Sequence, residues 1–291
     1  MPKYRLLRLL ESVFKILPGY LKYFILVILM GGLWFTYESL IARPAMSYMG
    51  LPKIESGIAA KGWSHVLRNE GYLLEYSETL ANPLWVTYKV TARQFKMGKR
   101  PSRFKADWRS IAGIHHSDYT RSGYDRGHMA PNYVIASRYG KSAQQETFLM
   151  TNITPQKSNL NQKSWQRLEE IIGNDFSKWY GDFWVVTGPI FSDTPQTMKN
   201  TQVAIPKAFY KILVKASTPE QPPIALAFIF PQNAKANADL MTFVTSIDEI
   251  EVQTGIDFFS KLEDDVEDVL EASQTPEAWR LQSVSKRPSR Y

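Results

Sequence analysis

One short polar segment contains the residue types that hydrolysis of a phosphodiester needs. Asp125, Arg126, Gly127 and His128 are consecutive, which places an acid, a cation and an imidazole around a glycine. An unperturbed imidazole has a pKa near ~6.5 and can therefore accept a proton from water at physiological pH. A guanidinium can bind a phosphate through two parallel hydrogen bonds. Gly127 is expected to let the backbone pass close to a substrate.

A second polar segment follows at residues 151–162, and a helix is predicted directly after it over 164–172. Asn161 offers a hard, neutral oxygen that suits Mg²⁺, an ion that often takes only one or two protein ligands. Glu169 comes about two helical turns later, so a helix that begins near Asn161 places both residues on one face. There Glu169 can hold the waters of the ion. The two segments together predict one metal-assisted site for phosphodiester cleavage.

The composition excludes several kinds of catalytic and metal-binding site. The 291-residue chain has no cysteine, which excludes disulfides, thiolate metal sites and a cysteine nucleophile. It also has no HExxH pattern, so no zinc site is expected. The formal net charge of +7 is compatible with a polyanionic partner. At residues 93–109 aromatic side chains alternate with basic ones, which is typical either of a surface on which nucleic-acid bases stack or of a solvated basic loop.

Strands and a central helix must position these groups. Aromatic and β-branched residues predict strands at 71–77, 83–91, 183–187, 209–214 and 225–230. A pair of helices is expected over 248–262, around Gly255, and an acidic, solvated helix over 263–271. Because the strands do not alternate with helices as in βαβ units, we expect an antiparallel α+β domain.

The N-terminal segment has the composition of a membrane anchor. Residues 1–22 are basic, and the predicted anchor, residues 23–43, begins with an uncharged run that extends to Tyr37. Its length approaches the ~20 residues of a spanning helix. Tyr23 and Trp34 lie near its ends, where aromatic rings favour the membrane interface. Because the basic residues precede the run, the N-terminus is expected in the cytoplasm and the rest of the chain across the membrane.

Two other interpretations of this segment stay open. A cleaved signal peptide is less favoured, because Leu40 and Arg43 occupy positions where a cleavage site needs small residues. The basic, leucine-rich residues 5–10 are also compatible with a mitochondrial presequence. After the anchor we expect a linker at 44–64, a catalytic domain at 65–272 and a flexible polar tail at 273–291.

The two polar segments resemble the signatures of the DNA/RNA non-specific endonuclease family. This family includes secreted bacterial sugar-nonspecific nucleases and mitochondrial endonuclease G, within the ββα-metal nucleases. Further similarity extends the resemblance over about residues 65–272. It implies an α+β, ββα-metal nuclease fold with a central antiparallel sheet flanked by helices, here preceded by one N-terminal transmembrane helix. The matching segments are 125–128, 130–131, 152–156, 160–162, 165, 168–169, 82–88, 186–191 and 205–211.

The resemblance also implies a role for each catalytic group. His128 corresponds to the general base. Asn161 corresponds to the direct protein ligand of the catalytic Mg²⁺, for which Mn²⁺ is an alternative. Glu169 corresponds to the acid that organises water around the ion. Arg126 corresponds to the phosphate-binding arginine, and Arg103 to an upstream arginine that stabilises the transition state.

Two further residues are expected to support the site, since Asn152 is similar to a supporting asparagine of the family and Asp125 lies beside the catalytic groups. The implied activity is a membrane-anchored, Mg²⁺-dependent endonuclease that cleaves DNA and RNA and leaves 5′-phosphate ends. A homodimer and a protein inhibitor stay open as partners. The catalytic domain is expected in the bacterial periplasm or outside the cell, or in the mitochondrial intermembrane space on an inner-membrane anchor.

Two other functions fit the same sequence. A nucleic-acid receptor would keep the fold but not cut. A more restricted phosphodiesterase would act on small or lipid-linked substrates, and its activity would depend little on salt, whereas binding of long nucleic acid weakens steeply as salt rises.

Overall fold

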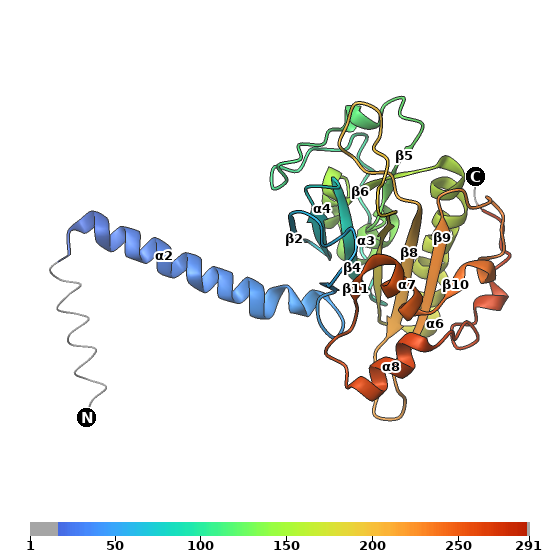
Figure 1. The fold of residues 1–291 in the computed structure, drawn as a ribbon. Coiled ribbons are helices and arrows are strands. Elements are labelled where there is room, and N and C mark those ends of the chain that lie inside the picture. Colours follow the sequence, from blue (N-terminus) through green and yellow to red (C-terminus); the bar gives the residue numbers. More distant parts are fainter. Residues whose placement is uncertain (1–16, 290–291) are drawn as a thin grey trace. The chain divides into compact units, whose positions relative to one another are not determined.

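The computed structural model describes residues 17–289, and the chain divides after Ala45 into two compact units (Figure 1). In the N-terminal unit, helix α2 (Gly19–Tyr37) continues into a π-helical turn, η1 (Glu38–Ala42). Helix α2 buries none of its residues. Within residues 17–289, this helical segment is the one that is long and apolar enough to cross a bilayer, with a mean hydropathy of 1.8. Most of the basic segment predicted at 1–22 lies outside the described residues.

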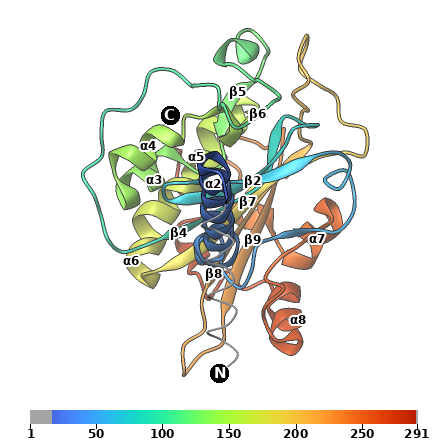
Figure 2. The same ribbon diagram turned by 90° about the vertical axis from the view of Figure 1, so that its left-hand side faces the viewer.

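The larger unit is built on a seven-stranded, fully antiparallel sheet, which Figure 2 shows between two groups of helices. The strand order is β10-β9-β8-β7-β4-β3-β2, so the central strands come from distant parts of the sequence. All five strands predicted from the sequence are confirmed. The strands are β2 (Ser64–Asn69), β3 (Tyr72–Ser77), β4 (Asn82–Val90), β7 (Phe183–Ile190), β8 (Ala208–Lys215), β9 (Ile224–Pro231) and β10 (Val244–Thr245).

Each face of this sheet packs against its own set of helices, because successive side chains of a strand point to opposite faces. Phe209 and Leu213 of β8 join one core with α3 (Asn132–Tyr139) and α5 (Gln166–Ile171). Tyr210 and Ile212 join the other core with α7 (Ile247–Thr254) and α8 (Asp264–Ala272). The sheet is therefore the middle of three layers.

A small ββα unit adjoins the first core. Strand β5 (Asp125–His128) pairs antiparallel with β6 (Ile153–Gln156) in a two-stranded sheet of its own. A π-helical turn, η5 (Leu160–Trp165), then leads into α5. The short helices α4 (Lys141–Glu146) and α6 (Ser177–Tyr180) complete this side of the fold. The α+β class with a central antiparallel sheet, predicted from the sequence, is confirmed.

The segments expected to be a linker and a tail differ from that expectation. Within 46–64, β1 (Lys53–Ile54) pairs with β11 (Ile256–Asp257), and Tyr48 and Ala59 are buried. Near the C-terminus, Trp279 and Leu281 are buried in the first core. Both segments stay on the domain because their few apolar side chains are buried there, although glycine, proline and polar residues dominate their composition.

The predicted pair of helices over 248–262 is wrong in its second half. Helix α7 ends at Thr254, and Gly255 adopts a left-handed conformation with φ of +69°. A glycine in this conformation is a common helix terminator. The chain then forms β11 instead of a second helix.

Candidate active site

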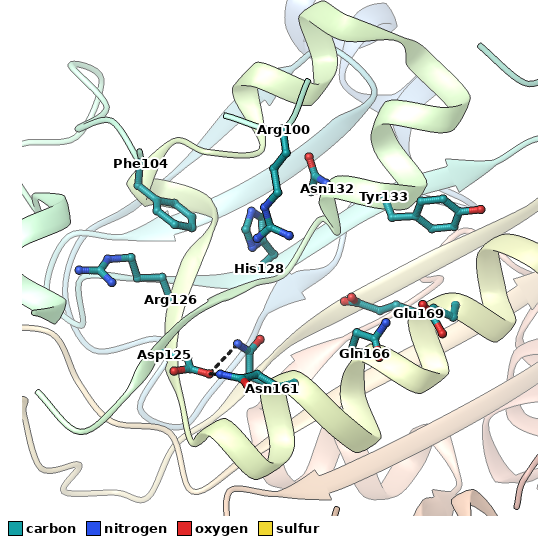
Figure 3. A pocket seen from close by; sticks show the side chains of 12 residues that line it. Arg100, Phe104, Asp125, Arg126, His128, Asn132, Tyr133, Asn161, Gln166 and Glu169 are labelled. Carbon is teal, nitrogen blue, oxygen red and sulfur yellow. Dashed lines mark hydrogen bonds between the residues drawn. The ribbon is translucent and has the colours of Figure 1, made fainter. Parts of the chain in front are cut away.

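A cavity of about 600 Å³ opens beside the ββα unit, and Figure 3 shows the side chains that line it. The structure brings most of the predicted site residues together there, although they come from segments far apart in the sequence. The predicted residues in the lining are Asp125, Arg126, His128, Asn161 and Glu169. The others are Arg100, Phe104, Asn132, Tyr133, Gln162, Gln166 and Glu170.

Strand β5 holds the first polar segment rigidly against β6. Gly127 lies opposite Thr154, and His128 lies opposite Ile153. A Cβ atom on Gly127 would collide with the side-chain amide of Gln156. The glycine is therefore explained by close packing between the strands, and the sequence-based expectation that it makes room for a substrate is not needed.

His128 is a half-buried imidazole at the edge of the cavity. Its ring centre lies 5.2 Å from that of Phe104 and 5.0 Å from that of Phe148. Its Nε2 is buried and has no hydrogen-bond partner among the described residues. Burial, and then the positive charge of Arg100, lower the pKa of His128 to about 3. The ring is therefore neutral at physiological pH, which is the state in which it can accept a proton.

Asp125 fixes the orientation of Asn161. Its Oδ2 accepts a hydrogen bond from Nδ2 of Asn161 at 3.0 Å and another from Nε2 of Gln162 at 2.8 Å (Figure 3). Its Oδ1 accepts from the hydroxyl of Ser158 at 3.0 Å. The opposite orientation of the Asn161 amide would set two oxygens against each other. Because the nitrogen is bound to Asp125, Oδ1 of Asn161 is the atom left to bind another group.

Glu169 lies beside a fully buried lysine, Lys211, to which no role was assigned from the sequence. Nζ of Lys211 is 3.9 Å from Oε1 of Glu169 and 4.2 Å from the ring centre of Trp165. Burial raises the pKa of Glu169 to about 7, and the charge of Lys211 partly opposes this rise. Burial likewise lowers the pKa of Lys211 to about 8. A lysine in the middle of the apolar strand Ala208–Lys215 was the available signal, since a buried charge needs a partner.

The donor atoms at this cavity fit a hard divalent cation. Asn161 presents an amide oxygen, and Oε1 of Glu169 is buried without a hydrogen-bond partner among the described residues. Neutral and anionic oxygens of this kind suit Mg²⁺ or Mn²⁺ rather than a thiolate-binding metal. The Asn161 and Glu169 side chains are therefore the residues that would hold such an ion.

The structure places the arginines differently, relative to the cavity, from what the sequence predicted. Arg126 lines the cavity, but its Nε and Nη2 donate to the carbonyl of His116 at 3.1 and 2.6 Å. Arg103 is exposed and is not among the residues that line the cavity. Arg100 lines the cavity and extends toward His128 (Figure 3). The sequence indicated only that the whole segment 93–109 is basic. It contained no signal to show which of Arg100 and Arg103 lines the cavity.

Asn152 lies behind the cavity and secures the backbone that follows β5. It is fully buried, and its Oδ1 accepts from the backbone N–H of Ala130 at 2.8 Å. Its Nδ2 donates to the carbonyls of Ala130 and Thr147, both at 3.0 Å. These three bonds fix the chain two residues after His128.

Comparison with known proteins shows the family to which this chain belongs. Residues 52–265 match the family model described as DNA/RNA non-specific endonuclease, and the chain belongs to this family. The family predicted from the two polar segments is thus confirmed.

Individual relatives agree with this assignment. The chain is 33% identical over 229 residues to "Nuclease" of Serratia marcescens, over 72% of this chain and 81% of that protein. It is 28% identical to "Nuclease EXOG, mitochondrial" of Danio rerio, over 74% of this chain and 64% of the relative. It is also 28% identical to human "Endonuclease G, mitochondrial", over 68% of this chain and 70% of the relative.

A solved structure has a similar fold. It is that of an EndoG/EndoGI complex, described as showing the mechanism of EndoG inhibition. The TM-score is 0.58 and the identity 27%, over 69% of this chain and 88% of the other.

Proposed function

We propose that this protein is a membrane-anchored endonuclease that depends on Mg²⁺ and hydrolyses phosphodiester bonds of DNA and RNA, leaving 5′-phosphate ends. Membership of the nuclease family supports the substrate class and the reaction class. The observation that supports the mechanism best is the shared cavity, in which a neutral imidazole faces the same space as Asn161 and Glu169.

His128 is the proposed general base. Its neutral ring accepts a proton from the attacking water, and Phe104 and Phe148 hold the ring in place. A general base of this kind contributes about 10²–10⁴-fold to a rate. Asp125 holds the amide of Asn161 in one orientation, and Lys211 favours the ionised form of Glu169.

Asn161 would bind Mg²⁺ directly and Glu169 would hold it through water. Mn²⁺ is the proposed alternative ion. When bound, the ion supplies stabilisation of the negative charge that develops on the departing 3′-oxygen. Arg100 and Arg126 add positive charge at the same cavity and are the proposed phosphate contacts. Arg103 is exposed, and we propose that it acts on substrate outside the cavity.

Low sequence preference follows from the groups available. The cavity offers arginines, amides and carboxylates, and the proposed contacts address phosphates and a cation. Contacts to phosphates position a nucleic acid but contain no direct information about the bases. The same residues can therefore act on duplex DNA, single strands and RNA.

The apolar helix α2 supports a membrane anchor. We propose that the N-terminus is cytoplasmic and that the catalytic domain lies in the periplasm or outside the cell. The mitochondrial relatives support the alternative, an inner-membrane anchor with the domain in the intermembrane space. An inhibitor protein is a further proposal, motivated by the EndoG/EndoGI complex. Self-association into a homodimer is also proposed and is testable by light scattering.

The direct test is digestion of duplex DNA, single-stranded DNA and RNA by the full-length chain in detergent micelles. We expect cleavage of all three with Mg²⁺ and none with EDTA. Tight binding of DNA without cleavage would replace the proposal with a nucleic-acid receptor. Neither binding nor cleavage, with hydrolysis of a small phosphodiester, would replace it with the restricted phosphodiesterase.

A further inference from the structure

A second group of acids lies on the other face of the sheet, in the layer formed by α7 and α8. One carboxylate oxygen each from Asp248, Glu251 and Glu271 lies within 4.8 Å of the other two. The helices concerned pack on the core that contains Tyr210, whereas α3 and α5 beside the catalytic cavity pack on the opposite core. This acidic cluster, Asp248, Glu251 and Glu271, is therefore separate from the candidate active site.

The sequence spacing concentrates negative charge at this point. Asp248 and Glu251 are three residues apart on α7, and Glu267 and Glu271 are four apart on α8. Residues at these spacings share one helix face, where like charges repel each other. The cluster is thus unfavourable for each helix alone and for the contact between the two.

Glu271 is the member that the surrounding protein leaves uncompensated. Its side chain is 7% exposed, and its buried Oε1 has no hydrogen-bond partner within residues 17–289. An unpaired carboxylate in such a place is strongly unfavourable unless it is protonated or binds a cation. Burial and the charges of Glu251, Glu267, Asp248 and Asp257 raise the pKa of Glu271 to about 9.

Nearby positive charge does not balance these acids. Lys53 of β1 pairs with Asp257 at 3.3 Å, on the strand that follows α7. Among the described residues, no lysine or arginine forms an ion pair with a member of the acidic cluster. Glu251 is held in place by the backbone N–H of Phe258, which donates to its Oε1 at 2.8 Å.

We propose that Asp248, Glu251 and Glu271 bind a calcium ion that joins α8 to α7. Calcium–oxygen distances are about 2.3–2.6 Å, so ligand oxygens on opposite sides of the ion are about 5 Å apart. The separation of at most 4.8 Å observed here fits that sphere. Calcium also accepts about six to eight oxygen ligands in flexible geometry, whereas Mg²⁺ demands a near-ideal octahedron, so three carboxylates from two helices suit calcium better.

The test measures calcium binding and thermal unfolding of the full-length chain in detergent micelles, after removal of metals with EDTA. Saturating CaCl₂ is expected to raise the Tm of the wild type by at least about 3 °C. Glu271→Gln is expected to lose this rise, while its Tm without calcium stays close to that of the wild type, because Glu271 with a pKa of about 9 is already neutral near pH 7 and glutamine keeps its size. Equilibrium dialysis with ⁴⁵Ca²⁺ should show one bound ion fewer in this variant.

Two control variants separate this site from other effects. Glu249→Gln removes one charge from the same helix but outside the acidic cluster, and it should keep the full calcium response. Asn161→Ala alters only the catalytic cavity and should also keep it, so failure of the proposed function leaves this result unaffected.

Three outcomes would overturn the calcium site. One is a wild type without a calcium-dependent rise in Tm, and a second is an equal rise in Glu271→Gln. If Glu271→Gln does not fold, the variant Asp248→Asn, at an exposed position, replaces it in the test. Loss of the calcium-dependent rise in Tm in Asp248→Asn supports the site, and an unchanged rise rejects it. The third is an equal rise with the same concentration of Mg²⁺ in Asn161→Ala, in which the catalytic cavity has lost its proposed metal ligand, and this would reject calcium as the preferred ion.

Discussion

The side-chain nitrogen of Asn161 donates a hydrogen bond of 3.0 Å to Oδ2 of Asp125. This contact joins the two polar segments, because Asp125 belongs to β5 and Asn161 to the turn that precedes α5. It orients the amide so that Oδ1 is available to a cation. In the proposed mechanism, Asp125 therefore positions the metal ligand Asn161 and takes no part in the proton transfer.

Asp125→Asn tests this contact with little change in volume. The substituted amide can present either an oxygen or a nitrogen to Asn161, so the orientation of Asn161 is no longer fixed. We expect the Mg²⁺ concentration for half-maximal cleavage to rise by about 10–100-fold, as is usual when a residue that orients a metal ligand is changed. Ser158→Ala, which removes only the bond to Oδ1 of Asp125, should have a much smaller effect. An unchanged Mg²⁺ requirement in Asp125→Asn would contradict the orientation role.

The pH dependence of metal binding should follow Glu169 and not His128. The pKa of Glu169 is about 7 and that of His128 about 3, so on acidification below pH 7 Glu169 takes up a proton first. Protons then compete with Mg²⁺, and the Mg²⁺ needed for half-maximal rate should rise by up to about tenfold per pH unit. This Mg²⁺ concentration is obtained by measuring the rate against Mg²⁺ at pH values between roughly 5.5 and 8, about one unit apart. Glu169→Gln should show no such slope, and a wild type without it would disprove the prediction.

Lys211→Met removes the cation beside Glu169 but keeps an unbranched side chain. Breaking a buried ion pair by removing one partner costs about 3–5 kcal/mol, and protonation of Glu169 should reduce that cost here. We expect the free energy of unfolding to fall by about 1–4 kcal/mol in denaturant titrations. The double variant Lys211→Met/Glu169→Gln should recover most of this lost stability, although it should be inactive because it lacks the Glu169 carboxylate. A double variant no more stable than Lys211→Met would show that the two charges are not coupled.

Arg100 and Arg103 form a matched pair for testing the phosphate contacts. Only Arg100 lines the cavity, so Arg100→Ala should lower kcat/KM on DNA by at least about tenfold. Arg103→Ala should change it by less than about threefold at moderate salt, as exposed charges are screened. Steady-state kinetics on one duplex substrate compares them. The reverse order of effects would favour the assignment of Arg103 made from the resemblance.

The sequence could predict the strands and the residues of the two polar segments, because alternation and residue type are local properties. It could not predict the partner of Glu169, since Lys211 of β8 reaches it only after α5 packs on that face of the sheet. It also could not show which arginine enters the cavity, because this depends on the path of a loop. The burial of Trp279 and Leu281 could not be predicted, since a few apolar side chains scattered in a polar segment give no periodic pattern.

The proposed mechanism depends above all on His128 acting as the base in a metal-dependent nuclease. The most direct measurement is single-turnover cleavage of duplex DNA with Mg²⁺ by His128→Ala, beside the wild type and the exposed His115→Ala, with circular dichroism to verify folding. We expect a loss of at least about 100-fold in His128→Ala and a rate close to that of the wild type in His115→Ala. Near-wild-type cleavage by a folded His128→Ala would contradict it.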